Sequence, residues 1–398
     1  MTMIDYQRYC KLYSENLLQN VVPFWLENSG DAQFGGYFTC LDREGKVYDT
    51  DKFVWLQARQ VWTFSMLYNR VERNNDWLNF AVSGAEFLKK YGRDAQGNWY
   101  FSLTREGRPL TQAYNIFSDC FATMAFAQLY KATGEEEYKT ISVDTFFNII
   151  GRQNNPKGRY SKVYPGTRPL QSFSLPMILS NLVLEIEHVL DPSLVEKVIS
   201  DGVNTVMSDF YQRESGLILE NVSVDGSFSN SFEGRLANPG HVLEAMWFLL
   251  DIASRTNNSE LTNKAVEIAL NTMDFGWDQE FGGIFYFKDI KGHPPLQLEW
   301  DQKLWWVHAE ALVCMLKSYL HTGDKRCRDW FVTLHDYTWK HFVDAEKGEW
   351  YGYLNRRGEV LLPLKGGKWK GCFHVPRALL QAWKTLETIE EKEAQIIV

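Results

Sequence analysis

The sequence has few cysteines, and none of them are closely spaced. The 398 residues contain six, with no CxxC pair: Cys10, Cys40, Cys120, Cys314, Cys327 and Cys372. Disulfide frameworks and cysteine-based zinc sites need clustered cysteines at recognisable spacings. The cysteines therefore point to neither kind of site, and we expect reduced thiols.

Long apolar runs and blocks of positive charge are also missing. No stretch reaches the roughly 18 apolar residues that would span a bilayer, and the first residues, MTMIDYQRYCKLYSEN, lack the apolar core of a signal peptide. The net charge is −8, with no basic block, which argues against nucleic acid or an anionic membrane as the main partner. We expect a cytoplasmic protein that binds neither.

Aromatic residues, in contrast, are abundant. The chain holds 15 Trp, 19 Tyr and 25 Phe, within an otherwise ordinary composition of 45% hydrophobic and 23% charged residues. A tryptophan-rich, weakly acidic protein suits a sugar better than a polyanion. The length allows one large domain or two.

A short aromatic segment recurs along the chain and divides it into repeats. Each of five copies has two strand-like runs around a turn, with glycines ten residues apart: Gly35/Gly45, Gly97/Gly107, Gly216/Gly226, Gly282/Gly292 and Gly348/Gly358. A weaker copy, NPKGRYSKVYPG, has Gly158 and Gly166 eight residues apart. Together these six units, each of about 63 residues, fill the chain.

Each interval between these segments has room for two helices. Apolar residues recur at helical spacing over 53–70 with 76–91, 114–133 with 137–151, 172–189 with 194–210, 239–256 with 259–275, and 303–322 with 326–342. One helix, 375–389, follows the last segment, and the helix 3–27 supplies its partner if the chain closes into a ring. We therefore predict an all-α (α/α)6 barrel over 1–398, a single catalytic domain with short β-hairpins at the mouth of its cavity.

An open solenoid of helical repeats is the alternative to a closed ring. Solenoids carry polar capping units at their ends, whereas both terminal helices here are rich in apolar residues. This favours closure. In the closed barrel the helix after each hairpin is the inner one, and its first turns face the cavity.

Four residues that carry chemistry share one phase of the repeat. Counted from the first glycine of each unit, Arg59 lies at +24, His241 at +25, and His308 and His374 at +26. A buried core histidine is the ordinary explanation for any one of them, but the shared phase indicates a shared cavity. We interpret the remaining histidines as structural: His188, His293, His321, His335 and His341.

His241 and His374 both stand at predicted helix starts. Asn238 and Pro239 suit the cap and first position before His241, and Pro376 follows His374. The positive end of a helix dipole disfavours imidazolium, so we expect two neutral bases at pH 7. Glu244, three residues after His241, is placed to orient its ring or to balance its charge. Two bases on opposite walls fit proton transfer at a carbon from either face.

Other readings of these residues stay open. The HxxE pattern with two further histidines is compatible with a metal site, although no HExxH motif is present. Toroids of this kind also house inverting glycosidases, which need two separated carboxylates, and Glu310, Asp119 and Glu244 are available. A glycosidase, however, does not require the paired histidines. A non-catalytic binding protein is a further alternative.

Four motifs carry a resemblance to a known family. FVWLQARQVW, NPGHVLEAMW, LWWVHAEAL and GCFHVPRALLQ, in this order, resemble the N-acylglucosamine 2-epimerase family, which also contains cellobiose 2-epimerases, aldose–ketose isomerases and renin-binding proteins. The resemblance covers nearly the whole chain and is closest to the bacterial N-acetylglucosamine 2-epimerases. It implies an (α/α)6 barrel, a homodimer, and interconversion of N-acetylglucosamine and N-acetylmannosamine. It further implies that His241 and His374 are the acid/base pair, with Arg59 near the carbonyl and Glu244 supporting His241.

One departure from the family pattern bears on the substrate. The isomerase and cellobiose epimerase branches place a further histidine in the segment SFSLPMILSNL, where this chain has Met177. A methionine offers an apolar neighbour for an N-acetyl group. The sequence therefore favours an N-acyl sugar, with an aldose–ketose isomerase or a cellobiose 2-epimerase as the alternatives.

The chemistry that follows needs neither a metal nor a redox cofactor. The sugar opens to its aldehyde, Arg59 stabilises the enolate oxygen, and the two histidines remove and return the C2 proton on opposite faces. The sequence does not assign a direction to either histidine. Residues expected to contact the sugar are Asn115, Asp119, Met177, Trp305, Trp306, His308, Glu310 and Trp369.

The weak third copy of the repeat is unusually basic. GRQNNPKGRYSK is not a Walker motif, and alone it reads as a solvated loop. The family includes enzymes that ATP activates without being hydrolysed, so the resemblance implies that ATP is a possible allosteric activator bound here. The residues expected to hold it are Arg152, Asn154, Lys157, Gly158, Arg159 and Lys162.

Overall fold

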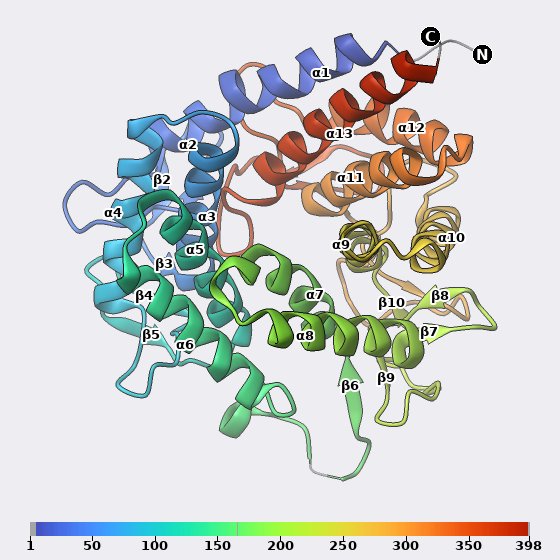
Figure 1. Ribbon diagram of the computed structural model, residues 1–398, viewed down its shortest axis with the longest axis horizontal. Helices are drawn as coiled ribbons and strands as arrows, with labels where there is room; N and C mark the ends of the chain where they lie inside the picture. Colours follow the sequence, from blue (N-terminus) through green and yellow to red (C-terminus); the bar gives the residue numbers. More distant parts are fainter. Residues whose placement is uncertain (1–4, 165, 397–398) are drawn as a thin grey trace.

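The computed structural model describes residues 5–164 and 166–396, which form two concentric rings of helices (Figure 1). The inner helices are α3 (Val54–Arg70), α5 (Ile116–Thr133), α7 (Ser174–Ile186), α9 (Pro239–Thr256), α11 (Trp305–Thr322) and α13 (His374–Ile396). The outer helices are α1 (Tyr6–Glu15), α2 (Val22–Asn28), α4 (Asn75–Tyr91), α6 (Glu136–Arg152), α8 (Pro192–Asn204), α10 (Ser259–Gly276) and α12 (Lys325–His341). This is the predicted (α/α)6 barrel. No described helix is long and apolar enough to cross a membrane.

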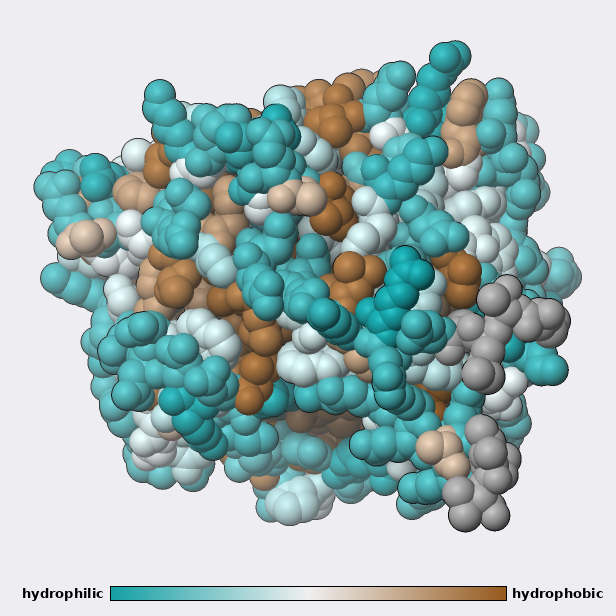
Figure 2. Space-filling model, turned by 90° about the horizontal axis from the view of Figure 1, so that it is seen from above, coloured by the Kyte–Doolittle hydropathy of each residue, from teal (hydrophilic) through white to brown (hydrophobic). Residues whose placement is uncertain are grey.

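The two rings differ in how much of each helix is covered. The inner helix α11 buries every residue from Trp305 to Ser318, because it has neighbours on all sides. The outer helix α12 buries one stripe and leaves the rest to solvent, which is the pattern of a surface helix. The face in Figure 2 is accordingly mostly hydrophilic, with apolar residues in small, scattered patches.

The ring closes as the sequence predicted, with α1 packed antiparallel against α13 (Figure 1). The Tyr6 hydroxyl donates to Glu393 Oε1 at 2.8 Å, near the start of one helix and the end of the other. A π-helical segment, Asn16–Val21, joins α1 to α2 just before Pro23. Proline has no N–H to donate to the preceding turn, which accounts for the local widening of the helix.

Short strands connect one repeat to the next. In four sheets the strand before an inner helix pairs with the hairpin of the following repeat, and two further hairpins stand alone. The four sheets are β3 (Lys52–Phe53) with β4 (Ser102–Leu103) and β5 (Pro109–Thr111), β6 (Leu170–Ser172) with β9 (Asn221–Ser223), β10 (Leu236–Ala237) with β11 (Lys288–Asp289), and β12 (Lys303–Leu304) with β13 (Tyr353–Leu354) and β14 (Val360–Leu362). The hairpins are β1 (Cys40–Leu41) with β2 (Val47–Asp49), and β7 (Tyr211–Gln212) with β8 (Leu217–Ile218). A single bridge between Asp42 and Leu364 links the last repeat to the first.

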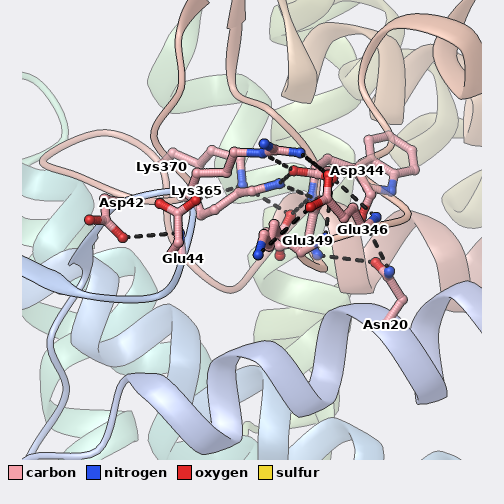
Figure 3. Close-up of polar contacts among 11 residues, drawn as sticks. Asn20, Asp42, Glu44, Asp344, Glu346, Glu349, Lys365 and Lys370 are labelled. Carbon is pink, nitrogen blue, oxygen red and sulfur yellow. Dashed lines mark hydrogen bonds and ion pairs between the residues drawn. The ribbon is translucent and has the colours of Figure 1, made fainter.

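A buried ionic cluster, which we call the hairpin clamp, recurs in the first, fifth and sixth repeats. In each clamp an aspartate at the start of the hairpin accepts from a fully buried lysine and from an arginine of the next hairpin. The three clamps are Asp31–Lys52–Arg105, Asp278–Lys303–Arg356 and Asp344–Lys365–Arg43. The Lys365 Nζ to Asp344 Oδ2 distance is 2.9 Å (Figure 3). Because Arg43 belongs to the first repeat, the third clamp also closes the ring.

The expected third hairpin is the one repeat feature that the structure does not form. Among its described residues there is no strand, only a 3-10 turn at Gly158–Tyr160 within an exposed loop. Asn154 stands four residues before Gly158, where the clamped repeats have their aspartate. No residue of 153–164 is buried, whereas the hairpin of the fourth repeat, which has Gln212 at this position, buries Leu217 and Ile218. The third segment therefore lacks the buried apolar residues that pack the other hairpins on the barrel.

Candidate active site

His374, the first residue of α13, is buried and held by a carboxylate. Its Nδ1 lies 2.7 Å from Glu310 Oε1 on α11. A carboxylate only accepts, so Nδ1 carries the hydrogen and Nε2 keeps its lone pair. Glu310 itself is fixed by Trp247 Nε1, at 2.8 Å, and by Arg377 Nη2, at 2.9 Å. Glu310 thus orients the histidine rather than facing the sugar as we expected.

His241 has a carboxylate of its own, but it is not the one expected. The Asn238 side chain caps α9 by accepting from the His241 N–H at 3.1 Å, as predicted. The ring Nδ1, however, lies 2.9 and 3.1 Å from the two oxygens of Glu220, a residue of the hairpin before the helix. Glu244 instead accepts from Arg377. Glu244 therefore does not orient the ring of His241, but its negative charge still contributes to raising the pKa of that ring, as expected of a charge-balancing residue.

The pKa values of the two histidines are shifted in opposite directions, so the two rings are not the equivalent bases that the sequence suggested. Burial, together with the Arg59 cation, holds the pKa of His374 well below its ordinary value. Burial also opposes the charging of His241, but the negative charge and hydrogen bond of Glu220 outweigh it and raise the pKa of His241. His374 is therefore set as a base and His241 as an acid.

Trp306 packs against both imidazoles. Its ring centroid is 5.1 Å from that of His241 and 5.7 Å from that of His374. Its neighbour Trp305 packs edge-on to His374 at 6.5 Å. Both tryptophans begin α11, so the start of one helix supplies aromatic rings beside both histidines.

Arg59 is surrounded by aromatic rings and forms no ion pair with an acid among the described residues. Its guanidinium carbon lies 4.3 Å from the Trp55 ring centroid, 4.0 Å from that of Phe121 and 4.8 Å from that of Phe373. Burial lowers its pKa to about 9, so the group still carries its charge at pH 7. Within the described chain its Nε has no hydrogen-bond partner. Such a cation is free to stabilise an oxyanion. Trp369, half exposed, packs on Trp55 at 5.7 Å.

Arg377 was missed by the sequence reading, although it lies one turn after His374. It is 2% exposed and donates to both Glu244 and Glu310. Glu244, Glu310 and His374 each offer a ligand atom within 4.8 Å of the others, as in a metal site. Arg377 already supplies positive charge to both carboxylates, however, so the arrangement fits an ion-pair network better than a metal-ion site. The same pairing ties up two of the acids that a glycosidase would use.

Comparison with known proteins identifies the family to which the chain belongs. The sequence model described as N-acylglucosamine 2-epimerase matches residues 36–378. The chain belongs to the N-acylglucosamine 2-epimerase family. Among relatives, it is 42% identical to the N-acylglucosamine 2-epimerase of Bos taurus, over 94% of this chain and 90% of that protein, and 41% identical to that of Homo sapiens, over 95% and 90%. A cellobiose 2-epimerase of Dictyoglomus turgidum is 23% identical, over 94% and 97%.

Solved structures show the same barrel. A cellobiose 2-epimerase from Bacillus thermoamylovorans superposes with a TM-score of 0.82 at 19% identity, over 95% of this chain and 99% of that one. A D-mannose isomerase also gives 0.82, at 18% identity, over 97% and 100%. At these identities the likeness shows the fold alone.

Two residues expected to contact the sugar have other roles in this member of the N-acylglucosamine 2-epimerase family. His308 is fully buried; its Nδ1 donates to the Leu304 carbonyl at 2.8 Å and its Nε2 accepts from the Ile284 N–H at 3.0 Å. Asp119 accepts from Arg152 of the outer helix α6 at 2.5 Å. Both residues thus use polar atoms to join their inner helix to a neighbouring element: His308 to the hairpin residue Ile284, and Asp119 to α6.

The other expected contacts lie at helix starts. Asn115 caps α5 by accepting from the Phe117 N–H at 3.0 Å. Met177 is buried near the start of α7, 5% exposed. Neither placement by itself assigns a contact to the substrate.

The basic loop is only partly available for a ligand. Arg152 is paired with Asp119, and Arg159 Nη2 donates to the Tyr160 hydroxyl at 2.7 Å. Lys157 and Lys162 are exposed, as are Asn154 and Gly158. Because Arg152 is already paired with Asp119, we remove it from the residues expected to bind phosphate.

Proposed function

We propose that this chain interconverts N-acetyl-D-glucosamine and N-acetyl-D-mannosamine by proton transfer at C2 of the open-chain sugar. One observation carries the proposal: two imidazoles pack on the same ring, Trp306, each is held through Nδ1 by its own carboxylate, and their pKa values are shifted in opposite directions. A reaction that removes a proton on one face and returns one on the other needs this pairing.

The steps follow from these contacts. The C2 proton of the aldehyde is acidified by the adjacent carbonyl, whose oxygen becomes negative as the proton leaves. Arg59 stabilises that charge from its aromatic surroundings, where the low dielectric strengthens the interaction. His374 Nε2 accepts the proton, and His241 Nε2 delivers one to the opposite face. The reverse reaction exchanges the two roles.

Similarity to relatives supports an N-acyl substrate. The mammalian N-acylglucosamine 2-epimerases are 41–42% identical to this chain, whereas the cellobiose 2-epimerases are 22–24% identical. Met177, apolar and buried near the start of an inner helix, remains our candidate neighbour for the acetyl group.

The test is incubation with N-acetylglucosamine, mannose or cellobiose in deuterated water, followed by detection of deuterium at C2. We expect label and epimer with N-acetylglucosamine. A keto product would identify an isomerase instead, and no label with any sugar would refute an epimerase. His241→Asn and His374→Asn should each abolish labelling while leaving the circular dichroism spectrum unchanged; near-normal turnover in either would refute the two-histidine scheme.

Three further features are proposals that rest on the family. They are a homodimer, a cytoplasmic location, and activation by ATP bound without hydrolysis at the basic loop. A nucleotide titration of activity, in the wild type and in Lys157→Gln, tests the last of these. Activity that does not change with ATP would exclude activation. Light scattering of the purified protein tests the dimer.

A further inference from the structure

The last repeat has extra residues directly before its catalytic histidine. In the first and fifth repeats the clamp lysines, Lys52 and Lys303, stand two residues before the start of the inner helix. In the sixth repeat Lys365 stands nine residues before His374, where α13 starts. Seven extra residues, 366–372, therefore separate the clamp from the helix. We call them the 366–372 insertion.

The insertion touches the candidate site at two places. Trp369 packs on Trp55, the ring that lies over the Arg59 guanidinium. The Cys372 carbonyl accepts from the Thr63 hydroxyl, on the same helix as Arg59, at 2.8 Å. The chain then runs directly into His374. The path of the insertion therefore decides where the imidazole lies relative to Arg59.

A buried ion pair holds the insertion in place (Figure 3). Lys370 Nζ donates to Glu349 Oε1 at 2.9 Å and to the Lys365 carbonyl at 2.8 Å. Lys370 is 1% exposed and Glu349 is fully buried. Glu349 also accepts from Trp25 Nε1 and, at 2.8 Å, from the Trp350 N–H. Both charges are thus paired within the protein interior.

Glu349 occupies a position that favours glycine. The corresponding residues of the first and fifth repeats are Gly36 and Gly283, with φ of +70° and +75°. Glu349 adopts the same left-handed conformation, with φ of +56°, although a residue with a Cβ is disfavoured there. Of the three clamped repeats, only the sixth has the insertion, and only the sixth has a glutamate in place of this glycine. The glutamate and the insertion are joined by the ion pair between Glu349 and Lys370.

We propose that Lys370 and Glu349 are a positioning pair for the reaction: they hold the 366–372 insertion and thereby place His374 relative to Arg59 and the sugar. This inference rests on the proposed function, since it gives the pair a task only if His374 transfers the proton. Neither residue contacts the reacting atoms. Misplacement of a catalytic group by about 1 Å can lower a rate about 10²-fold.

The experiment compares Lys370→Met, Glu349→Gly and the double variant. Each single change leaves a buried charge without its partner, which should lower both the melting temperature and kcat. The double variant restores the glycine of the other repeats and leaves neither charge. We expect its melting temperature to recover much of the loss, while kcat stays about 10²-fold below wild type with KM nearly unchanged. Amide exchange over 366–373 should be faster in the double variant.

Recovery of kcat together with the melting temperature would overturn the inference, because the pair would then only stabilise the fold. Unchanged amide exchange over 366–373 would overturn it as well. Lys52→Met is the matched control, since it removes a fully buried clamp lysine from a repeat without the insertion. It should lower the melting temperature without a comparable loss of kcat, and an equal loss of kcat would count against the proposal.

Failure of the proposed function has a different signature. A wild-type protein that places no deuterium on C2 of any sugar would refute the epimerase. Amide exchange would in that case still decide whether the pair holds the insertion, and a role in positioning a catalytic base would be withdrawn.

Discussion

Removing the carboxylate that raises the pKa of His241 should change the pH profile of the reaction in a defined direction. Glu220→Gln keeps the shape of the side chain but loses the negative charge at 2.9 Å from Nδ1. Because that charge and its hydrogen bond outweigh burial and raise the pKa of His241, the pKa should fall once they are gone. The protonated imidazole then survives only to a lower pH.

The size of the shift follows from the contact that is lost. A hydrogen bond to a charged group contributes about 1.5–3 kcal/mol, and about 1.4 kcal/mol corresponds to one pKa unit. The alkaline limb of kcat/KM should therefore move down by about one to two pH units. Both directions of epimerisation should show the same shift, because the equilibrium constant fixes the ratio of their kcat/KM values at every pH.

The assay is the initial rate in each direction between pH 5 and 10, with product quantified by NMR. Glu233→Gln is the control, since Glu233 lies in the loop that follows the same hairpin but is exposed and does not contact His241. An alkaline limb that stays in place, or that moves equally in the control, would refute the assignment of His241 as the acid.

Three other changes have expected outcomes. Burial lowers the pKa of His308 to about 3, so the unfolded chain binds a proton below about pH 6.5 that the folded chain does not, and stability is lost as the pH falls. In urea titrations, the free energy of unfolding should therefore fall less between pH 7 and pH 5 in His308→Gln than in wild type. An equal fall in the two proteins would contradict this. Lys365→Met should lower the free energy of unfolding by about 3 kcal/mol, because it breaks a buried pair although Asp344 keeps Arg43; a change below about 1 kcal/mol in urea unfolding would not fit. Met177→His should raise the activity ratio of mannose to N-acetylglucosamine, and an unchanged ratio would remove Met177 from the acetyl site.

The fold was largely predictable because the periodicity of the sequence repeats six times. The helix ranges differ from the structure by a few residues, and the antiparallel pairing of α1 with α13 confirms the closed ring. The third hairpin does not form because none of residues 153–164 is buried against the barrel, which the count between glycines does not reveal. The clamp role of Asp31, Asp278 and Asp344 becomes visible only when they are seen with their partners.

The site was harder to predict, since its partners come from other repeats and from loops. Glu220 lies 21 residues before His241, beyond any helical spacing. The only feature of the sequence that could have pointed to it is an acidic residue directly after the apolar run of the fourth hairpin. The phase of the histidines also misled for His308. It shares its count from the first glycine with His374, but it is the fourth residue of its helix whereas His374 is the first. The extra residues before His374 shift the count, so the two side chains project in different directions.

Because the barrel is a closed ring, each repeat keeps the same two neighbours in space wherever the ends of the chain are placed. The start of α1 lies beside the end of α13, joined by the Tyr6–Glu393 hydrogen bond, and the two form an inner–outer pair like the other five (Figure 1). A short linker between them, with new termini opened in the exposed loop around Gly158, would give a circular permutant in which this pair is contiguous and every contact of the site is kept. The clamp between Arg43 and Asp344 would then join two consecutive repeats of the chain instead of its last repeat and its first.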